Sequence, residues 1–304
     1  MTNHIPPVQN NLINRYLEIL KKSLLNELYI ENEARIIQVI SSVVNKEELD
    51  LKCLFETNLN NDIIEVLTRV KQDGDYLTIS KTNPDKSLTP APQLRNLTEL
   101  SHTMIGRKRL DNLQCCMEEI LRNNIPGDFI ETGVWRGGTT IFMRGLLASY
   151  DVKDRFVWVA DSFMGVPPPS HEEDKGIDLS ASVLPVLAVS LEKVKELFSR
   201  YDLLDSQVKF LKGWFKDTLH TAPITQLSLL RLDGDLYEST MDALEALYDK
   251  VSPGGFIIID DYWSVPSCKV AINTFRKERK IEDELIPVDK HCVFWVKMIG
   301  RAHV

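Results

Sequence analysis

The first third of the chain carries apolar residues at the spacing of amphipathic helices. Between residues 11 and 44 they recur every three or four positions, beginning with Leu12, Tyr16 and Leu20, and this periodicity predicts helix. A second apolar run over residues 63–70 stops at the turn signal Asp73-Gly74-Asp75. Residues 78–98 are polar and contain three prolines, so we expect a linker or a surface arm there.

From about residue 108 the pattern changes to short apolar strands that alternate with helices. The predicted strands cover residues 128–132, 156–160, 208–211, 227–232 and 255–259, and the predicted helices cover 110–121, 139–149, 191–198 and 238–248. Continuous apolar runs suit central strands of a parallel sheet, which are buried on both faces. Helices between the strands imply right-handed βαβ crossovers. A C-terminal hairpin over 284–288 and 293–296 would add an antiparallel edge.

These elements predict an α/β fold with a doubly wound, mostly parallel sheet. Five predicted strands and the two strands of the hairpin make seven. We assign residues 1–96 to a helical N-terminal extension with a linker, and residues 97–304 to the doubly wound domain.

The amino-acid composition of the chain argues against several classes of binding partner. The 304 residues include 36 Lys and Arg and 44 Asp and Glu, a formal net charge of −8, which argues against nonspecific binding to nucleic acid. Five cysteines without CxxC spacing form neither a disulfide framework nor a zinc site. The N-terminus lacks the pattern of a signal peptide, and no apolar run reaches the roughly 18 residues that span a bilayer. We expect a cytoplasmic protein without a membrane partner.

The turn after the first predicted strand is a candidate ligand site, because ligands of open α/β sheets bind beyond the carboxyl ends of the strands. Its sequence is Glu131-Thr-Gly133-Val-Trp-Arg-Gly137-Gly138, which is not the GxGxxG of dinucleotide sites. Glu131 would repel a pyrophosphate and attract a cationic ligand such as S-adenosylmethionine. The alternative is that these glycines only pack a helix against the sheet.

Two further strand ends fit an adenosine-containing ligand. Asp161, followed by Ser162, ends the second strand, where an acid can accept hydrogen bonds from both hydroxyls of a ribose; a helix N-cap is the alternative. Gly213-Trp214-Phe215 follows the third strand and offers aromatic faces for a purine, although such rings often belong to the core. Together with the glycine turn, Asp161 leaves NAD and S-adenosylmethionine both open.

The last two parallel strands end in carboxylates. Asp233 and Asp235 follow one strand, and Asp260 and Asp261 follow the next. Like charges gathered at one sheet edge demand protonation or a cation, and oxygen ligands suit magnesium. We therefore predict that Asp233, Asp260 and Asp261 bind a divalent metal, and that Asp235 is a general base for a metal-oriented hydroxyl. A turn or cap is the alternative for the Asp260-Asp261 pair alone.

A long, proline-rich stretch, residues 164–182, separates the second strand from the next helix. Loops of this length in a compact domain are often lids that exclude water. A loose insertion is the competing interpretation.

Several long motifs in this chain resemble the macrocin, mycinamicin and novobiocin O-methyltransferases over approximately residues 97–298. They are HTMIGRKRLDNLQ, ETGVWRGGTTIFMRG, VWVADSFMGVPPP, GWFKDTL, LRLDGDLYESTMDALEALYDKVSPGGF and IDDYW. The resemblance implies a class I methyltransferase fold of the Rossmann-like type, S-adenosylmethionine as methyl donor and Mg²⁺ as cofactor. It also implies a set of cofactor-binding residues: Met104, Ile105, Glu131, Gly133, Thr139, Asp161, Ser162, Gly213, Trp214, Phe215 and Asp233.

The resemblance supports Asp233, Asp260 and Asp261 as metal ligands and Asp235 and Asp233 as catalytic residues. It implies an enzyme that methylates a hydroxyl of a natural product, whether on a sugar, polyketide or peptide portion, and a homo-oligomer, as a dimer or higher. Residues 31–90 exceed the compact family pattern, and we expect them to shape the acceptor pocket or a subunit interface. The alternatives are a nicotinamide-dependent oxidoreductase and a non-catalytic partner with the same fold.

Overall fold

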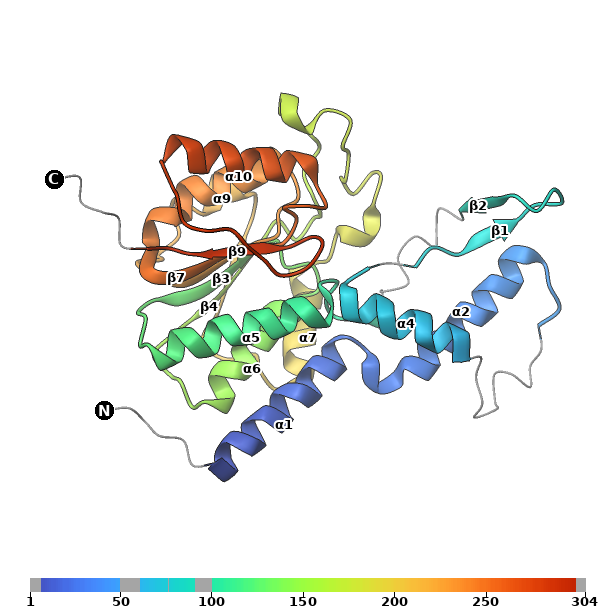
Figure 1. The fold of residues 1–304 in the computed structure, drawn as a ribbon, viewed down its shortest axis with the longest axis horizontal. Coiled ribbons are helices and arrows are strands. Elements are labelled where there is room, and N and C mark those ends of the chain that lie inside the picture. The colour runs from blue at the N-terminus through green and yellow to red at the C-terminus, as the bar shows by residue number, and fades with distance from the viewer. Residues whose placement is uncertain (1–6, 50–60, 76, 91–99, 299–304) are drawn as a thin grey trace. The chain divides into compact units, whose positions relative to one another are not determined.

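The computed structural model describes residues 7–49, 61–75, 77–90 and 100–298 of the 304 (Figure 1). By their contacts the residues form two compact units, one of residues 18–108 and the other of residues 1–17 with 109–304. Helix α1 (Pro7–Leu24) and helix α5 (Gly106–Arg122) each run across a boundary between the units.

The unit of residues 18–108 is built mainly of helices, as the sequence predicts. It contains the C-terminal part of α1, a short 3₁₀ helix η1 (Glu27–Tyr29), α2 (Ile30–Asn45) and α4 (Asn61–Asp73). A small apolar core forms between α2 and α4 from Ala34, Ile37, Leu67 and Ile79. The expected polar arm contains an antiparallel hairpin of β1 (Ser80–Thr82) and β2 (Leu88–Pro90); its remainder, residues 91–98, lies outside the described residues.

A buried ion pair ties this helical unit together. The ammonium of Lys71 lies 2.6 Å from Oε2 of Glu33 and also donates to the backbone carbonyl of Leu25 at 2.8 Å and to Oγ of Ser101 at 3.2 Å. Asn26 donates to the same oxygen of Glu33 at 3.0 Å. Both charged side chains are almost fully buried, so their mutual contacts offset the cost of removing them from water.

The other unit holds the sheet, and its strands confirm the prediction closely. They are β3 (Asp128–Thr132), β4 (Val157–Asp161), β5 (Val208–Lys212), β6 (Leu227–Leu232), β7 (Val251–Ile259), β8 (Ile286–Pro287) and β9 (Val293–Val296). Their order in the seven-stranded sheet is β5-β4-β3-β6-β7-β9-β8. The first five are parallel and β9 is antiparallel to both neighbours. The predicted doubly wound, mostly parallel fold is confirmed.

Helices cover both faces of this sheet. Helices α9 (Tyr237–Leu247) and α10 (Pro266–Glu278) lie on one side, and α5, α6 (Gly138–Ser149) and α7 (Leu191–Arg200) lie on the other (Figure 1). Alternate strand residues such as Ile130, Leu230 and Ile257 join the core with α9 and α10. Helix α10 is an element that the sequence analysis missed, as is the single turn α8 (Phe215–Thr218).

None of the helices in the described ranges combines the length and the apolar character that crossing a bilayer requires. The cytoplasmic location stays a prediction.

Candidate functional site

Backbone hydrogen bonds continue the sheet one residue beyond its strands and so align the residues that follow them. Gly133 donates to the carbonyl of Ala160, and Gly213 to that of Asp161, at 2.9 and 3.0 Å. On the other side of β3, Asp233 donates to Thr132 and Asp260 donates to Leu232, each at 2.9 Å. The carboxyl ends of all five parallel strands therefore meet at one edge, as expected for a ligand site.

Gly133 stands where the strand order reverses, between β3 and β6. Its φ of 89° is in the left-handed region, and an added Cβ would lie only 1.8 Å from the carbonyl oxygen of Asp233. Only glycine allows both this conformation and this approach. The turn after β3 is therefore in close backbone contact with the segment that carries Asp233. Gly137 lies close to α7, because an added Cβ there would meet a side-chain carbon of Val194 at 2.8 Å.

Asp161 holds the glycine turn from the neighbouring strand. Its Oδ2 accepts the N–H of Val134 at 2.8 Å, and its Oδ1 accepts the N–H of Phe163 at 2.7 Å. Burial raises the pKa of this carboxyl, although the backbone donors oppose the rise. The hydroxyl of Ser162 also lies 3.5 Å from Oδ1, and the predicted role of Asp161 toward a ribose stays a prediction. Ser162 accepts from the N–H of Met164 and donates to the carbonyl of Gly165.

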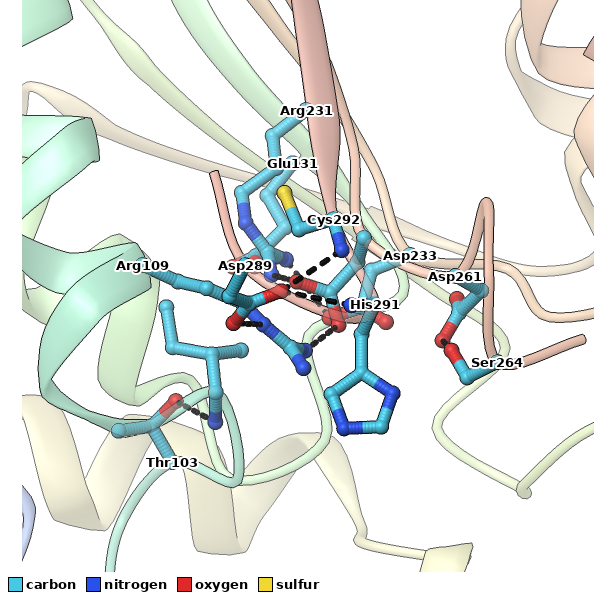
Figure 2. Close-up of polar contacts among 12 residues, drawn as sticks. Thr103, Arg109, Glu131, Arg231, Asp233, Asp261, Ser264, Asp289, His291 and Cys292 are labelled. Atoms are coloured by element: carbon cyan, nitrogen blue, oxygen red, sulfur yellow. Dashed lines mark hydrogen bonds and ion pairs between the residues drawn. The ribbon is translucent and has the colours of Figure 1, made fainter. Parts of the chain in front are cut away.

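Arg231 is the residue around which the acids gather, and the sequence analysis gave it no role. The register of β3 and β6 places it beside Glu131. Its Nη1 donates to Oε1 of Glu131 at 2.5 Å and to Oδ2 of Asp233 at 2.6 Å (Figure 2). Its Nη2 donates to Oδ1 of Asp260. Its side chain is 1% exposed. A lone charge inside an otherwise apolar strand was the available signal, because such a charge requires buried partners.

A second guanidinium, that of Arg109 on α5, reaches the same site from the helical face. Its Nη1 lies 2.6 Å from Oδ2 of Asp260, and its Nε lies 2.8 Å from Oδ2 of Asp289 (Figure 2). Asp289 in turn accepts the backbone N–H groups of His291 and Cys292 through Oδ1, each at 2.8 Å. Asp260 is therefore held through both of its oxygens.

The acids remain in excess of these two arginines. We call the group the acidic cluster, and its members are Glu131, Asp233, Asp235, Asp260, Asp261 and Asp289. Burial, followed by repulsion from neighbouring carboxylates, raises the pKa of Asp233 to about 6 and that of Asp235 to about 8. Burial also raises the pKa of Glu131 to about 8, against the opposing effect of Arg231. Such shifts show that the cluster favours a proton or a cation.

Three of these acids can share an ion. One carboxylate oxygen from each of Asp233, Asp260 and Asp261 lies within 4.8 Å of the other two, the grouping that the sequence predicts. Oδ2 of Asp261 is buried with no hydrogen-bond partner among the described residues, and its Oδ1 accepts only weakly, from Ser264 at 3.4 Å. Burial and then the neighbouring acids raise the pKa of Asp261 well above its ordinary value. An orphaned oxygen beside two further carboxylates fits a hard divalent cation.

Asp235 occupies a strained turn next to this group. Its φ is 59°, which is uncommon for a residue other than glycine and is typical of functional positions. The N–H of Leu236 closes the turn by donating to the carbonyl of Gly234 at 2.6 Å. Phe215 of α8 approaches this turn, since an added Cβ at Gly234 would lie 3.2 Å from its ring. Phe215 also packs on the core, while Trp214 is half-buried and begins α8.

The remaining predicted cofactor residues fall in different places. Thr139 is buried in the first turn of α6, directly after the glycine turn. Met104 and Ile105 belong to the unit of residues 18–108, where Ile105 packs by its carbonyl against Gly74. Their role in cofactor binding stays a prediction.

The predicted lid, residues 164–182, is anchored to α9. Asp174 is fully buried and accepts the N–H of Tyr237 at 2.7 Å and that of Glu238 at 3.3 Å, so it caps the helix that follows Asp235. His171 stacks on the ring of Tyr237, with centroids 4.4 Å apart. These contacts indicate that residues 164–182 pack on α9, and they disfavour a loose insertion.

Comparisons with protein families, with individual relatives and with solved structures all indicate the same family. The model of the macrocin O-methyltransferase (TylF) family matches residues 13–297 of this chain. The matched range includes residues 31–90, and the expectation that this segment shapes the acceptor pocket or a subunit interface stays a prediction.

Individual relatives agree with the family model. Demethyldecarbamoylnovobiocin O-methyltransferase of Streptomyces niveus is 55% identical over 197 residues, which cover 64% of this chain and 75% of that protein. Mycinamicin III 3''-O-methyltransferase of Micromonospora griseorubida is 52% identical over 200 residues, covering 64% and 78%. The solved structure of the O-methyltransferase NovP is 41% identical, with a TM-score of 0.72 over 94% of this chain and 100% of that one. The calicheamicin methyltransferase CalS11, at 20% identity and a TM-score of 0.52 over 64% and 81%, shares the fold.

Proposed function

This chain belongs to the macrocin O-methyltransferase family and is an S-adenosylmethionine-dependent O-methyltransferase, and we propose that it methylates a hydroxyl of a natural product with the help of Mg²⁺. The names of the relatives support the acceptor class, because they specify novobiocin and mycinamicin precursors. The nicotinamide-dependent oxidoreductase and the non-catalytic partner are thereby disfavoured.

The observation that carries the metal proposal is the orphaned oxygen of Asp261 beside Asp233 and Asp260. These three residues would hold the ion. When bound, S-adenosylmethionine supplies the methyl group, and the ion lowers the pKa of an acceptor hydroxyl and orients it. The two arginines hold Asp233 and Asp260 in place, so two of the three proposed ligands would need little rearrangement to bind the ion.

The other residues of the edge have complementary roles in this proposal. Oε2 of Glu131 is buried with no hydrogen-bond partner in the described part of the chain and would accept from the cationic amino group of the cofactor. Asp161 would accept from the ribose hydroxyls, and Trp214 would contact the purine. Asp235 would remove the proton of the acceptor hydroxyl, because its raised pKa makes its ionised form a stronger base. The segment 164–182 would exclude water above them.

Chelation and one substitution test the metal proposal. We expect turnover to fall at least about 100-fold in excess EDTA and to return with Mg²⁺. Asp261→Asn should lose activity to a similar extent, yet its free energy of unfolding in EDTA should rise, because the change removes a buried charge from a repelling cluster. Asp151→Asn, at an 81% exposed site, is the control and should change neither quantity. Full turnover in EDTA would refute metal assistance.

Assembly as a homo-oligomer is a further part of the proposal. Ile36 and Val43 lie one heptad apart on α2 and are 41% and 70% exposed, and Tyr29, a further seven residues back, is 63% exposed. An apolar stripe of this kind suits contact with a second copy. Light scattering should report at least a dimer, and Ile36→Glu with Val43→Glu should reduce the mass to that of a monomer. A monomeric parent protein would contradict the proposal.

A further inference from the structure

A single guanidinium nitrogen joins the acid proposed for the cofactor to an acid proposed for the metal. Nη1 of Arg231 donates to Glu131 at 2.5 Å and to Asp233 at 2.6 Å, while Nη2 of the same group binds Asp260. The three acids come from three adjacent strands, β3, β6 and the end of β7. The arginine is 1% exposed, so bulk water does not screen these contacts.

We propose that Arg231 is a positioning residue that fixes the metal ligands and couples metal binding to cofactor binding; the inference rests on the function proposed above. The planar guanidinium presents its donors in a fixed fork, and one group can therefore orient several carboxylates at once. Each oxygen that accepts from Arg231 keeps another lone pair. Arg231 thus sets the direction of the Asp233 and Asp260 carboxylates.

Arg109 makes the arrangement rigid from the other side. It binds the second oxygen of Asp260 at 2.6 Å and is itself held by Asp289 at 2.8 Å. Asp289 is fixed by two backbone N–H groups. Asp260 therefore sits between two arginines, and its carboxylate has little freedom to rotate. Partners of metal ligands in such a position commonly contribute 10–100-fold to metal affinity.

The shared nitrogen gives the coupling. An ion bound to Asp233 would withdraw negative charge from that carboxylate and change the strength of its hydrogen bond from Nη1. Because Nη1 also donates to Glu131, the strength of that second hydrogen bond would change as well. By linkage, the effect of Mg²⁺ on S-adenosylmethionine affinity equals the effect of S-adenosylmethionine on Mg²⁺ affinity. A coupling carried by direct contacts of this kind should reach about 5-fold or more.

Calorimetry on the full chain tests both parts without measuring turnover. We expect Arg231→Lys, which keeps the charge and loses the fork, to bind Mg²⁺ about 10–100-fold more weakly. The affinity for S-adenosylmethionine with and without Mg²⁺ should then differ by less than about 2-fold in this variant, against about 5-fold in the parent. Arg144→Lys is the matched control, because Arg144 is also buried and makes a two-pronged contact with Asp205, at 3.0 and 2.5 Å, away from the acidic cluster. It should leave both affinities unchanged.

A second variant keeps the test decisive if Arg231→Lys folds poorly. Glu131→Gln leaves Arg231 in place and removes the carboxyl group that shares its nitrogen with Asp233. The freed guanidinium should bind Asp233 more tightly, and the cluster becomes less negative, so Mg²⁺ affinity should fall at least about 3-fold although Glu131 is not a proposed ligand. A purely local role of Glu131 in cofactor binding predicts unchanged Mg²⁺ affinity.

The outcomes separate this inference from the proposed function. Normal Mg²⁺ binding by the parent with unaltered affinity in Arg231→Lys or in Glu131→Gln would overturn the inference alone. A parent in which S-adenosylmethionine and Mg²⁺ bind independently would overturn the coupling. A parent that binds no Mg²⁺ would overturn both the inference and the proposed metal assistance.

Discussion

Replacement of Gly133 by alanine tests whether the close packing at the strand-order reversal builds the site. The added Cβ would lie 1.8 Å from the carbonyl oxygen of Asp233, and ordinary contacts begin at 3.4 Å, so the two segments would have to separate by about 1.6 Å. The carbonyl cannot move alone, because the N–H of the same residue is bonded to Thr132 at 2.9 Å. The displacement would therefore shift Asp233 relative to Asp260 and Asp261, which follow the next strand.

Gly176 provides a control that isolates this steric effect. Its φ of 86° is close to the 89° of Gly133, but an added Cβ there would meet no atom within 4 Å. Gly176→Ala should therefore cost only the left-handed backbone conformation, about 1–2 kcal/mol. Gly133→Ala should cost at least about 3 kcal/mol, because the displacement of packed backbone adds to that strain.

Urea unfolding monitored by circular dichroism measures both losses, and calorimetry with S-adenosylmethionine measures the effect on the site. A displacement of about 1 Å near reacting groups commonly costs 100-fold in rate, so we expect Gly133→Ala to lose activity to at least that extent. Equal losses of stability in the two variants, with unchanged cofactor affinity and turnover, would refute the packing argument.

Three further predictions concern other parts of the molecule. Lys71→Met should lower the free energy of unfolding by about 3–5 kcal/mol, because it leaves Glu33 buried without its cation. The double variant Lys71→Met with Glu33→Leu should recover most of that loss. Denaturant unfolding measures both changes. Asp174→Ala should cost about 1 kcal/mol as a lost helix cap and should speed amide hydrogen exchange in residues 164–182, whereas unchanged exchange would contradict the anchor. The hydrogen bond from Arg144 lowers the pKa of Asp205, so the pair contributes stability above the unfolded pKa near 3.9 that is lost as pH falls below it. Because Asp205 is 41% exposed, the loss should stay under about 1 kcal/mol, and Asp205→Asn should flatten the pH dependence of unfolding below pH 5.

The strands of the sheet were predictable because each is a short segment rich in apolar residues and bounded by turn signals. Residues 128–132 and 227–232 were placed without error at either end. Helix α10 was missed although Cys268, Ala271, Ile272 and Phe275 have helical spacing and are buried. Pro266 and the polar residues around it indicated a loop, but proline at the first turn of a helix is also a start signal.

The site was only partly predictable, for a different physical reason. Strand order places the ends of β3, β6 and β7 together, so acids at those ends could be grouped from the sequence. Which arginine side chains pair with these acids depends on contacts between residues that are far apart in the chain. Arg109 and Asp289 are 180 positions apart, and Arg231 and Glu131 are 100 apart. No local pattern encodes these pairs, and only the register of β3 against β6 reveals the second of them.

The acidic cluster contains more carboxylates than its two arginines can pair. We infer that the excess carboxylates serve the reaction. A cluster that served only the fold would be most stable with each buried acid paired, because an unpaired buried carboxylate costs several kcal/mol. Here two arginines satisfy Asp233, Asp260 and Asp289, while one oxygen of Glu131 and one of Asp261 are buried and find no partner among the residues that the structure describes. The two orphaned oxygens belong to the acid assigned to the cationic cofactor and to an acid assigned to the metal. The apo protein is therefore destabilised at the two positions where a positively charged ligand would bind, and binding would relieve the destabilisation.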